Sequence, residues 1–216
     1  MASDRMERLR DAVLYLVCDA HPGGREAAPF LDAALRGGVD VVQLRDKRLD
    51  HDGLVAAAVV FRAACAHHDA LFVLNDDPEL AAEVGADGVH VGQDDAPADQ
   101  ARAAVGPERI VGLSTHTAAQ FDAAVSGGVA DYVAVGPVHA TPTKPGRPAA
   151  GLEPVRHAAR HASLPWFAIG GLDEARLAPV VAAGARRAVV VRALTLAPDP
   201  ERAARALRRA LGARPT

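Results

Sequence analysis

The stretch Gly85-Ala-Asp-Gly-Val-His-Val91 shows how this chain is built: a glycine ends an Ala-rich run, an aspartate follows, and a short apolar run begins. The same order occurs in Gly38-Val-Asp-Val41 and Gly128-Val-Ala-Asp-Tyr-Val133, and in Gly184-Ala-Arg-Arg-Ala-Val189 with arginine instead of aspartate. Glycine commonly follows the last residue of a helix, and a short Val-rich run bounded by turn signals is typical of a buried strand. Each stretch therefore predicts the point where a helix ends and a strand begins.

Working outward from these junctions gives an alternation of short apolar runs and Ala-rich runs. Strands are expected at Val13–Val17, Val39–Leu44, Leu71–Leu74, Gly88–Val91, Ile110–Ser114, Tyr132–Val135, Trp166–Ile169 and Ala188–Val191. Helices are expected at Glu26–Arg36, Gly53–His67, Pro78–Val84, Pro97–Val105, Ala118–Ser126, Glu153–Ala162, Glu174–Ala183 and Pro200–Leu211. Continuously apolar strands are typical of a parallel sheet covered on both faces. Eight strand–helix units predict the α/β class and a closed (β/α)8 TIM barrel, with residues 1–216 forming one domain.

Composition narrows the classes of function. The 216 residues carry a formal net charge of −3, so charge gives no reason to expect nucleic acid or an anionic membrane as a partner. The N-terminal residues lack the apolar segment of a secretory signal, and no apolar run approaches the roughly 20 residues that span a bilayer. The expectation is a soluble cytoplasmic protein whose two cysteines, Cys18 and Cys65, are buried and reduced. Nothing in the sequence indicates an oligomeric state.

Active sites of such barrels lie in the loops after the strands, so polar residues there are the candidates. After the second strand, period-two spacing would put Gln43, Arg45 and Lys47 on one side, an arrangement suited to a polyanion. Asp76 and Asp95 follow the third and fourth strands and are candidate ligands of a hard cation such as Mg2+. The neighbouring Asp77 and Asp94 are interpreted as a helix cap or as exposed loop charges.

The later loops add further candidates. Ser114 bonds a phosphate or caps the next helix, and the Pro-rich segment Gly136–Gly151 either closes over a phosphorylated substrate or is a surface excursion. Gly170-Gly171, after the seventh strand, is placed where barrels often bind phosphate. His90 and His116 are interpreted as a core histidine and a loop histidine.

Several segments, in chain order, resemble the thiamine-phosphate synthase family. They are Gln43-Leu-Arg-Asp-Lys47, Asn75-Asp76, Gly88-Val-His-Val-Gly-Gln-Asp-Asp95, Gly112-Leu-Ser-Thr-His116, Gly136-Pro with Thr141-Pro-Thr-Lys144, Gly170-Gly171 and the final Val-Val-Val191-Arg192. The resemblance spans nearly the whole chain.

The resemblance implies an enzyme, a transferase that joins a pyrimidine methyl diphosphate to a thiazole phosphate and releases pyrophosphate. It implies that the pyrimidine diphosphate is bound by Gln43, Leu44, Arg45, Asp46, Lys47, Asn75, Ser114 and Lys144, with Arg45, Lys47 and Lys144 catalytic. It assigns the thiazole phosphate to Thr141, Pro142, Thr143, Gly171, Val191 and Arg192, and Mg2+ to Asp76 and Asp95. The implied partners are these two small molecules. The reaction implied passes through a pyrimidine methylene cation, and no protein nucleophile is needed.

The chain departs from the family in two places. Arg192 stands where the family often has serine, and His139-Ala140 replaces an aromatic–proline pair. Three other barrels remain as alternatives: a thiazole tautomerase, a phosphosugar-type isomerase, and a non-catalytic barrel that binds phosphorylated metabolites. The set of Arg45, Lys47 and Lys144 with two carboxylates favours the synthase over the tautomerase, and the paired carboxylates are unexplained in the isomerase. Only turnover measurements separate the non-catalytic barrel from the enzymes.

Overall fold

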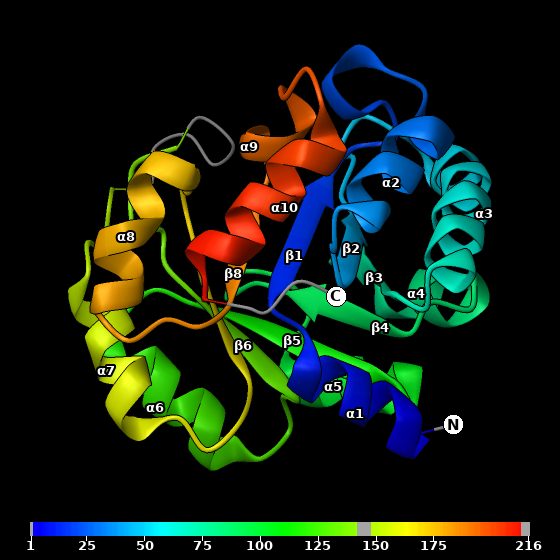
Figure 1. Cartoon of the computed structure of the whole chain (residues 1–216). Coiled ribbons are helices and arrows are strands. Elements are labelled where there is room, and N and C mark those ends of the chain that lie inside the picture. The colour runs from blue at the N-terminus through cyan, green and yellow to red at the C-terminus, as the bar shows by residue number, and fades with distance from the viewer. Residues whose placement is uncertain (1, 142–147, 213–216) are drawn as a thin grey trace.

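The computed structural model describes residues 2–141 and 148–212 and shows a closed barrel of eight parallel strands surrounded by helices (Figure 1). The strands pair in chain order, and β8 pairs back with β1. They are β1 (Leu14–Cys18), β2 (Val41–Leu44), β3 (Leu71–Asn75), β4 (Gly88–Val91), β5 (Ile110–Thr115), β6 (Tyr132–Val135), β7 (Trp166–Ile169) and β8 (Ala188–Val190). The helices are α1 (Ala2–Asp11), a 3-10 turn η1 (Pro22–Gly24), α2 (Ala27–Arg36), α3 (His51–His67), α4 (Pro78–Glu83), α5 (Ala98–Val105), α6 (Ala118–Gly127), α7 (Glu153–His161), α8 (Glu174–Ala182), α9 (Arg192–Thr195) and α10 (Pro200–Ala210).

The predicted barrel is confirmed, and the differences are local. The second strand begins at Val41 rather than Val39, because the Val39 N–H still bonds to the Ala34 carbonyl in the turn that ends α2. Two helices were not predicted. α1 lies in the charged N-terminal segment, and α9 is a single turn, too short to give a periodic signal.

Two separate apolar layers form the core, one inside the barrel and one between the barrel and its helices. Alternate strand residues face each layer, since successive side chains of a strand point to opposite faces. Tyr15, Val41 and Phe167 pack inside, whereas Leu14, Val42 and Ala168 pack against the helices. Both faces are apolar over most of each strand, which is why the sequence showed no hydrophobic alternation.

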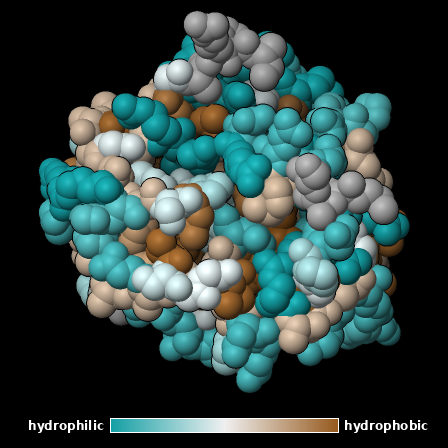
Figure 2. All heavy atoms as spheres, turned by 90° about the horizontal axis from the view of Figure 1, so that it is seen from below, coloured by the Kyte–Doolittle hydropathy of each residue, from teal (hydrophilic) through white to brown (hydrophobic). Residues whose placement is uncertain are grey.

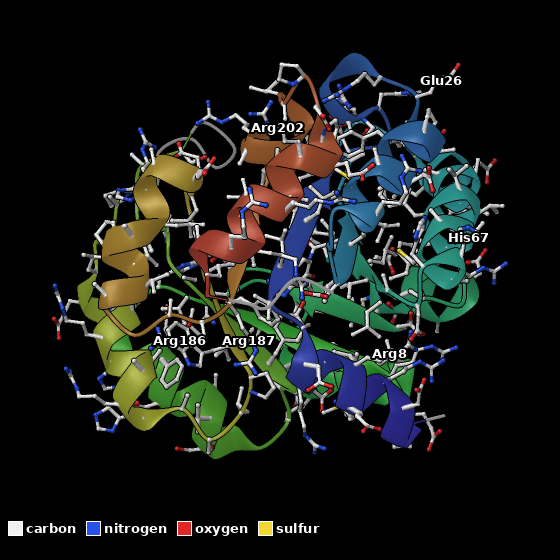
Figure 3. The ribbon with its side chains drawn as sticks, in the orientation of Figure 1. Arg8, Glu26, His67, Arg186, Arg187 and Arg202 are labelled. Atoms are coloured by element: carbon white, nitrogen blue, oxygen red, sulfur yellow. The ribbon has the colours of Figure 1, made fainter. Side chains whose placement is uncertain are left out.

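The barrel interior is closed at the amino ends of the strands by α1. Leu9 of this helix is 1% exposed and packs in the same cluster as Leu71 and Ile110, the first residues of β3 and β5. Arg187, just before β8, donates from Nε to the Ala12 carbonyl at 2.9 Å and so ties the end of this helix to the barrel (Figure 3).

The repeated aspartate before a strand has a structural role. Each one accepts a backbone N–H from the preceding strand and an arginine side chain: Asp40 from Leu14 and Arg208, Asp87 from Phe72 and Arg5, and Asp131 from Val111 and Arg102. The carboxylate thereby satisfies a backbone donor at a strand start that has no ladder partner. The repeat found in the sequence is thus a device for joining neighbouring strands at their amino ends.

Seen from below, hydrophobic residues lie in small groups among hydrophilic ones (Figure 2). Across the described ranges, no helix combines the length and the apolar character that crossing a bilayer requires.

Candidate active site

A cavity of about 340 Å3 opens at the carboxyl ends of the strands. Its walls come from every part of the barrel, because closure brings the ends of all the strands to one rim. The lining residues are Tyr15, Val17, Gln43, Arg45, Asn75, His90, Ser114, His116, Ala134, Gly136, Pro137, Thr141, Ile169, Gly170, Gly171, Leu172, Asp173, Arg176, Val189, Val191, Arg192 and Ala193. Eight of the residues predicted for the site are among them: Gln43, Arg45, Asn75, Ser114, Thr141, Gly171, Val191 and Arg192.

Strand alternation separates the predicted residues of the segment that ends β2. Gln43 and Arg45 face the cavity, and Gln43 is 3% exposed. Leu44 faces the opposite layer and packs against the helices. Asp46 is buried, and its carboxylate accepts from the Arg48 side chain at 2.9 Å. Leu44 and Asp46 do not line the cavity, so their part in binding stays a prediction.

Lys47 and Asp76 meet at the rim. The Lys47 Nζ lies 3.0 Å from the Asp76 Oδ2, an ion pair between the end of β2 and the end of β3. Asp76 has a φ of 69°, a left-handed conformation that costs free energy for any residue with a Cβ. Its N–H donates to the His90 carbonyl at 2.8 Å, so β4 holds this strained backbone in place. Asp77 next to it caps α4 by accepting from the Leu80 N–H, as interpreted from the sequence.

Asp95 lies in the exposed turn after β4. Its Oδ2 accepts from the Gly92 N–H at 2.8 Å, so the turn orients this carboxylate. Asp76 and Asp95 together offer oxygen donors at the ends of neighbouring strands, the ligand type that Mg2+ prefers. In the parts of the chain the structure describes, no group of three or more His, Cys, Asp or Glu side chains is placed to hold a metal.

The cavity floor is a connected set of polar side chains. His90 bonds through Nε2 to the Ser114 Oγ and through Nδ1 to the Tyr132 hydroxyl, each at 2.9 Å. The Tyr132 and Tyr15 hydroxyls lie 2.8 Å apart, and Gln43 donates to Tyr15 at 2.6 Å. Burial raises the pKa of both tyrosines, so both hydroxyls keep their protons.

Glycines form the opposite wall, after β7. Gly170 and Gly171 have φ values of 110° and 63°, which glycine adopts without steric cost. A Cβ on Gly170 would lie 2.5 Å from the Pro137 Cα, so no other residue fits here. Val191 and Arg192 complete this wall.

The structure adds residues that the sequence did not indicate. Arg176, on the first turn of α8, lines the cavity and donates to the Gly171 carbonyl at 3.1 Å. Tyr15 and Asp173 also line it. His116, interpreted from the sequence as a loop histidine, lines the cavity too, and its Nδ1 bonds the Gly136 carbonyl. A helix residue such as Arg176 gives no local signal, because its nearness to Gly171 depends on how α8 packs. Tyr15 was hidden inside an apolar strand.

The structure describes only the first residue of the predicted site segment Thr141-Pro-Thr-Lys144. Thr141 lines the cavity, whereas Pro142, Thr143 and Lys144 lie outside the described residues. Their roles stay predictions.

Comparison with known proteins identifies the family. The family model described as thiamine monophosphate synthase matches residues 14–194, from the start of β1 into α9. The chain belongs to this family. The predicted resemblance is thereby confirmed, and so is the prediction that the chain is an enzyme of the transferase class.

The curated relatives agree over nearly their full length. The chain is 54% identical over 206 residues to the thiamine-phosphate synthase of Thermobifida fusca (strain YX), covering 95% of this chain and 94% of that protein. It is 50% identical over 212 residues to the thiamine-phosphate synthase of Saccharopolyspora erythraea, covering 95% of each.

The solved structures agree on the fold. The thiamine phosphate pyrophosphorylase from Pyrococcus furiosus superposes with a TM-score of 0.84 at 28% identity, covering 96% of this chain and 97% of that one. The (S)-3-O-geranylgeranylglyceryl phosphate synthase from Thermoplasma acidophilum, at 15% identity and a TM-score of 0.71, shares the fold alone.

Proposed function

We propose that this chain condenses 4-amino-2-methyl-5-(diphosphooxymethyl)pyrimidine with 4-methyl-5-(2-phosphooxyethyl)thiazole, or its 2-carboxylate, to give thiamine phosphate and pyrophosphate in the cytoplasm. With the 2-carboxylate, CO2 is released as well. The observation that carries the proposal is the cavity at the carboxyl ends of the strands. It places Gln43, Arg45, Asn75 and Ser114 along one side and Gly171 with Arg192 along the other. Two phosphorylated substrates need two such polar regions facing one reaction space.

The pyrimidine diphosphate would lie on the β2, β3 and β5 side. The Gln43 amide and the Ser114 hydroxyl are buried, so they suit the ring, whereas Arg45 and the rim lysine Lys47 suit the phosphates. Lys144 is proposed as a further contact to the diphosphate from the segment after β6.

Mg2+ is proposed as the cofactor, held by Asp76 and Asp95. The donor chemistry fits, because both residues are carboxylates at the ends of adjacent strands. Mg2+ is commonly bound through one or two carboxylates plus substrate phosphates rather than by an all-protein cage. When bound, it would supply positive charge to the diphosphate. The Lys47 ammonium already lies 3.0 Å from the Asp76 carboxylate, so both groups are in position before the diphosphate binds.

The thiazole phosphate would lie against the wall after β7 and β8. Gly170 and Gly171 both line this wall, and glycine backbone can turn its N–H groups toward an oxyanion. Arg192 and Arg176 add positive charge to this end of the cavity.

The proposed reaction needs no protein nucleophile. The bond between the pyrimidine methylene carbon and the bridging oxygen breaks, and its electron pair leaves with pyrophosphate. The pyrimidine amino group spreads the positive charge of the resulting cation, and the thiazole nitrogen lone pair forms the new carbon–nitrogen bond. Arg45, Lys47 and Lys144 stabilise the departing negative charge, and the cavity aligns the two rings.

Turnover with both substrates tests the proposal. Mass spectrometry of an incubation with fresh substrates should show thiamine phosphate and pyrophosphate in the presence of magnesium, and little product without it. Absence of product with magnesium present would defeat the synthase assignment. Isomerisation of the thiazole partner alone would instead indicate the tautomerase.

Isosteric variants test the metal ligands. Asp76→Asn and Asp95→Asn should each lower kcat/KM about 100-fold or more, the usual loss when a preorganised charge contact is removed. The neighbouring Asp77 supplies the control, because Asp77→Asn retains a helix cap and should stay close to wild type. Equal losses in all three variants, or in none, would contradict the metal assignment.

Lys144 is tested in the same assay. Lys144→Ala should abolish turnover while the thermal unfolding temperature stays at the wild-type value, and wild-type rates would refute its role.

A further inference from the structure

We infer that Tyr132, which does not line the cavity, is a positioning residue. It fixes which groups of the cavity floor donate a hydrogen bond to a ligand and which accept one. The inference rests on the proposed function for its substrate, but its first test does not. It concerns one chain of buried hydrogen bonds, called the relay here: Gln43, Tyr15, Tyr132, His90 and Ser114.

The relay runs from Gln43 to Ser114 through one side chain that does not line the cavity. Gln43, Tyr15, His90 and Ser114 all line it, whereas Tyr132 is 0% exposed and is not one of the lining residues. The four donor–acceptor distances are 2.6, 2.8, 2.9 and 2.9 Å, all within hydrogen-bonding range. Changing the direction of one bond therefore affects the groups at both ends.

The direction of each bond follows from proton counting. Gln43 donates from Nε2 to the Tyr15 hydroxyl, which then gives its single proton to Tyr132. Tyr132 in turn gives its proton to the His90 Nδ1, since a buried hydroxyl without an acceptor is costly. Both tyrosines keep their protons because burial raises the pKa of each.

The consequence appears at the other end of the relay. A neutral His90 that accepts at Nδ1 has its proton on Nε2 and donates it to the Ser114 Oγ. The Ser114 hydroxyl proton then remains for a ligand, while the Gln43 amide, its nitrogen turned to Tyr15, offers its oxygen. The cavity floor thus presents one acceptor and one donor. Reversing every bond would flip the amide and exchange these two roles.

This polarity suits an aminopyrimidine. The amino group of the ring is a donor and the ring nitrogen beside it is an acceptor, so the Gln43 oxygen takes the first and the Ser114 hydroxyl the second. The amino group becomes more positive as pyrophosphate leaves, and an oxygen facing it then helps more than in the ground state. The reversed relay would point an N–H donor at that growing positive charge.

A glycine on the neighbouring strand leaves space for the Tyr132 ring. Gly112 lies on β5 beside Tyr132 of β6, and a Cβ on Gly112 would lie 2.1 Å from the Tyr132 Cζ and 2.4 Å from its hydroxyl oxygen. The ring therefore occupies the space that any other residue at position 112 would take. Tyr132 also contacts Phe167 edge-on, with ring centroids 5.6 Å apart.

The histidine tautomer tests the relay without turnover. In protein carrying 15N-labelled histidine side chains, the His90 signals are assigned by their loss in His90→Gln. NMR should show the His90 proton on Nε2 in the wild type. It should show this preference lost in Tyr132→Phe, which removes the hydroxyl, and in Gly112→Ala, which displaces the ring but keeps all five relay residues. Phe167→Leu disturbs the same aromatic cluster without touching a relay bond and should keep the wild-type tautomer.

Kinetics then tests the role in the proposed reaction. Tyr132→Phe and Gly112→Ala should lower kcat about tenfold, the usual effect of one misdirected hydrogen bond, and change the KM for the pyrimidine diphosphate by less than about threefold. A wild-type His90 protonated on Nδ1 overturns the inference. So do variants that lose the tautomer preference but keep wild-type kcat. If the wild type itself shows no synthase turnover, the proposed function fails, and the tautomer measurement still decides the relay.

Discussion

Asp40 joins the start of the barrel to the C-terminal helix, and replacing it with asparagine should destabilise the fold without touching the cavity. Its Oδ2 accepts from the Val13 and Leu14 N–H groups at 2.7 and 2.9 Å. Both of its carboxylate oxygens lie 2.7 Å from a terminal guanidinium nitrogen of Arg208. Asparagine has the same shape but only one acceptor oxygen. In Asp40→Asn, an NH2 group must therefore face either a backbone donor or the Arg208 guanidinium.

The magnitude follows from those contacts. A hydrogen bond to a charged group contributes about 1.5–3 kcal/mol, and here the charge is lost as well. The Asp40 side chain is 26% exposed and that of Arg208 11%, so solvent screens part of the pair and the lower half of the range applies. We expect a loss of about 2 kcal/mol in the free energy of unfolding, or about 4–8 °C in Tm for a domain of this size.

The assay is thermal and urea unfolding followed by circular dichroism. Glu108→Gln, an exposed carboxylate in the turn before β5, is the control and should unfold at the wild-type Tm. Arg208→Met should lose a similar amount, and the double variant should lose less than the sum, because both changes break one interaction. If Asp40→Asn unfolds within about 1 °C of the wild type, the reasoning on the aspartate repeat is refuted.

Three further predictions concern the substrate cavity, pH and thiols. Arg176→Ala should raise the KM for the thiazole phosphate about tenfold, the effect of one lost charged contact, and leave the KM for the pyrimidine diphosphate unchanged. Steady-state kinetics with each substrate varied in turn measures both constants. Equal changes in the two KM values would mean that Arg176 only supports α8. The Arg48 side chain lowers the pKa of Asp46 in the folded protein. The ionised carboxylate therefore stabilises the fold at pH values above the pKa of Asp46 in the unfolded chain. This stabilisation is lost as the pH falls through the pKa of Asp46 in the folded protein. The difference in unfolding free energy between wild type and Asp46→Asn should therefore shrink below about pH 4, and a constant difference in acid titrations would be inconsistent with this account. Burial raises the pKa of the free thiols Cys18 and Cys65, so a thiol reagent should label neither until denaturant is added; rapid labelling of native protein would contradict their burial.

How far the sequence could predict the site is clearest at β2. The order Gln43-Leu-Arg-Asp-Lys47 placed these residues at a strand end, and period-two spacing assigned Gln43 and Arg45 correctly to one side. The strand itself ends at Leu44, and Lys47 reaches the rim through an ion pair with Asp76 rather than as a strand residue. Strand spacing cannot predict that contact, because it depends on where β3 ends.

The sequence by itself determined the alternation of strands and helices, the junctions marked by glycine and aspartate, and which polar residues follow which strand. These are local properties, set by caps, turns and apolar runs that act within a few residues. Tertiary structure alone decided that α1 closes the barrel, that Arg176 of α8 enters the cavity wall, and that Tyr132 joins Tyr15 to His90. Each of those contacts joins residues whose nearness comes only from closing the sheet and packing helices around it. No local pattern records that step, because the strands are apolar on both faces.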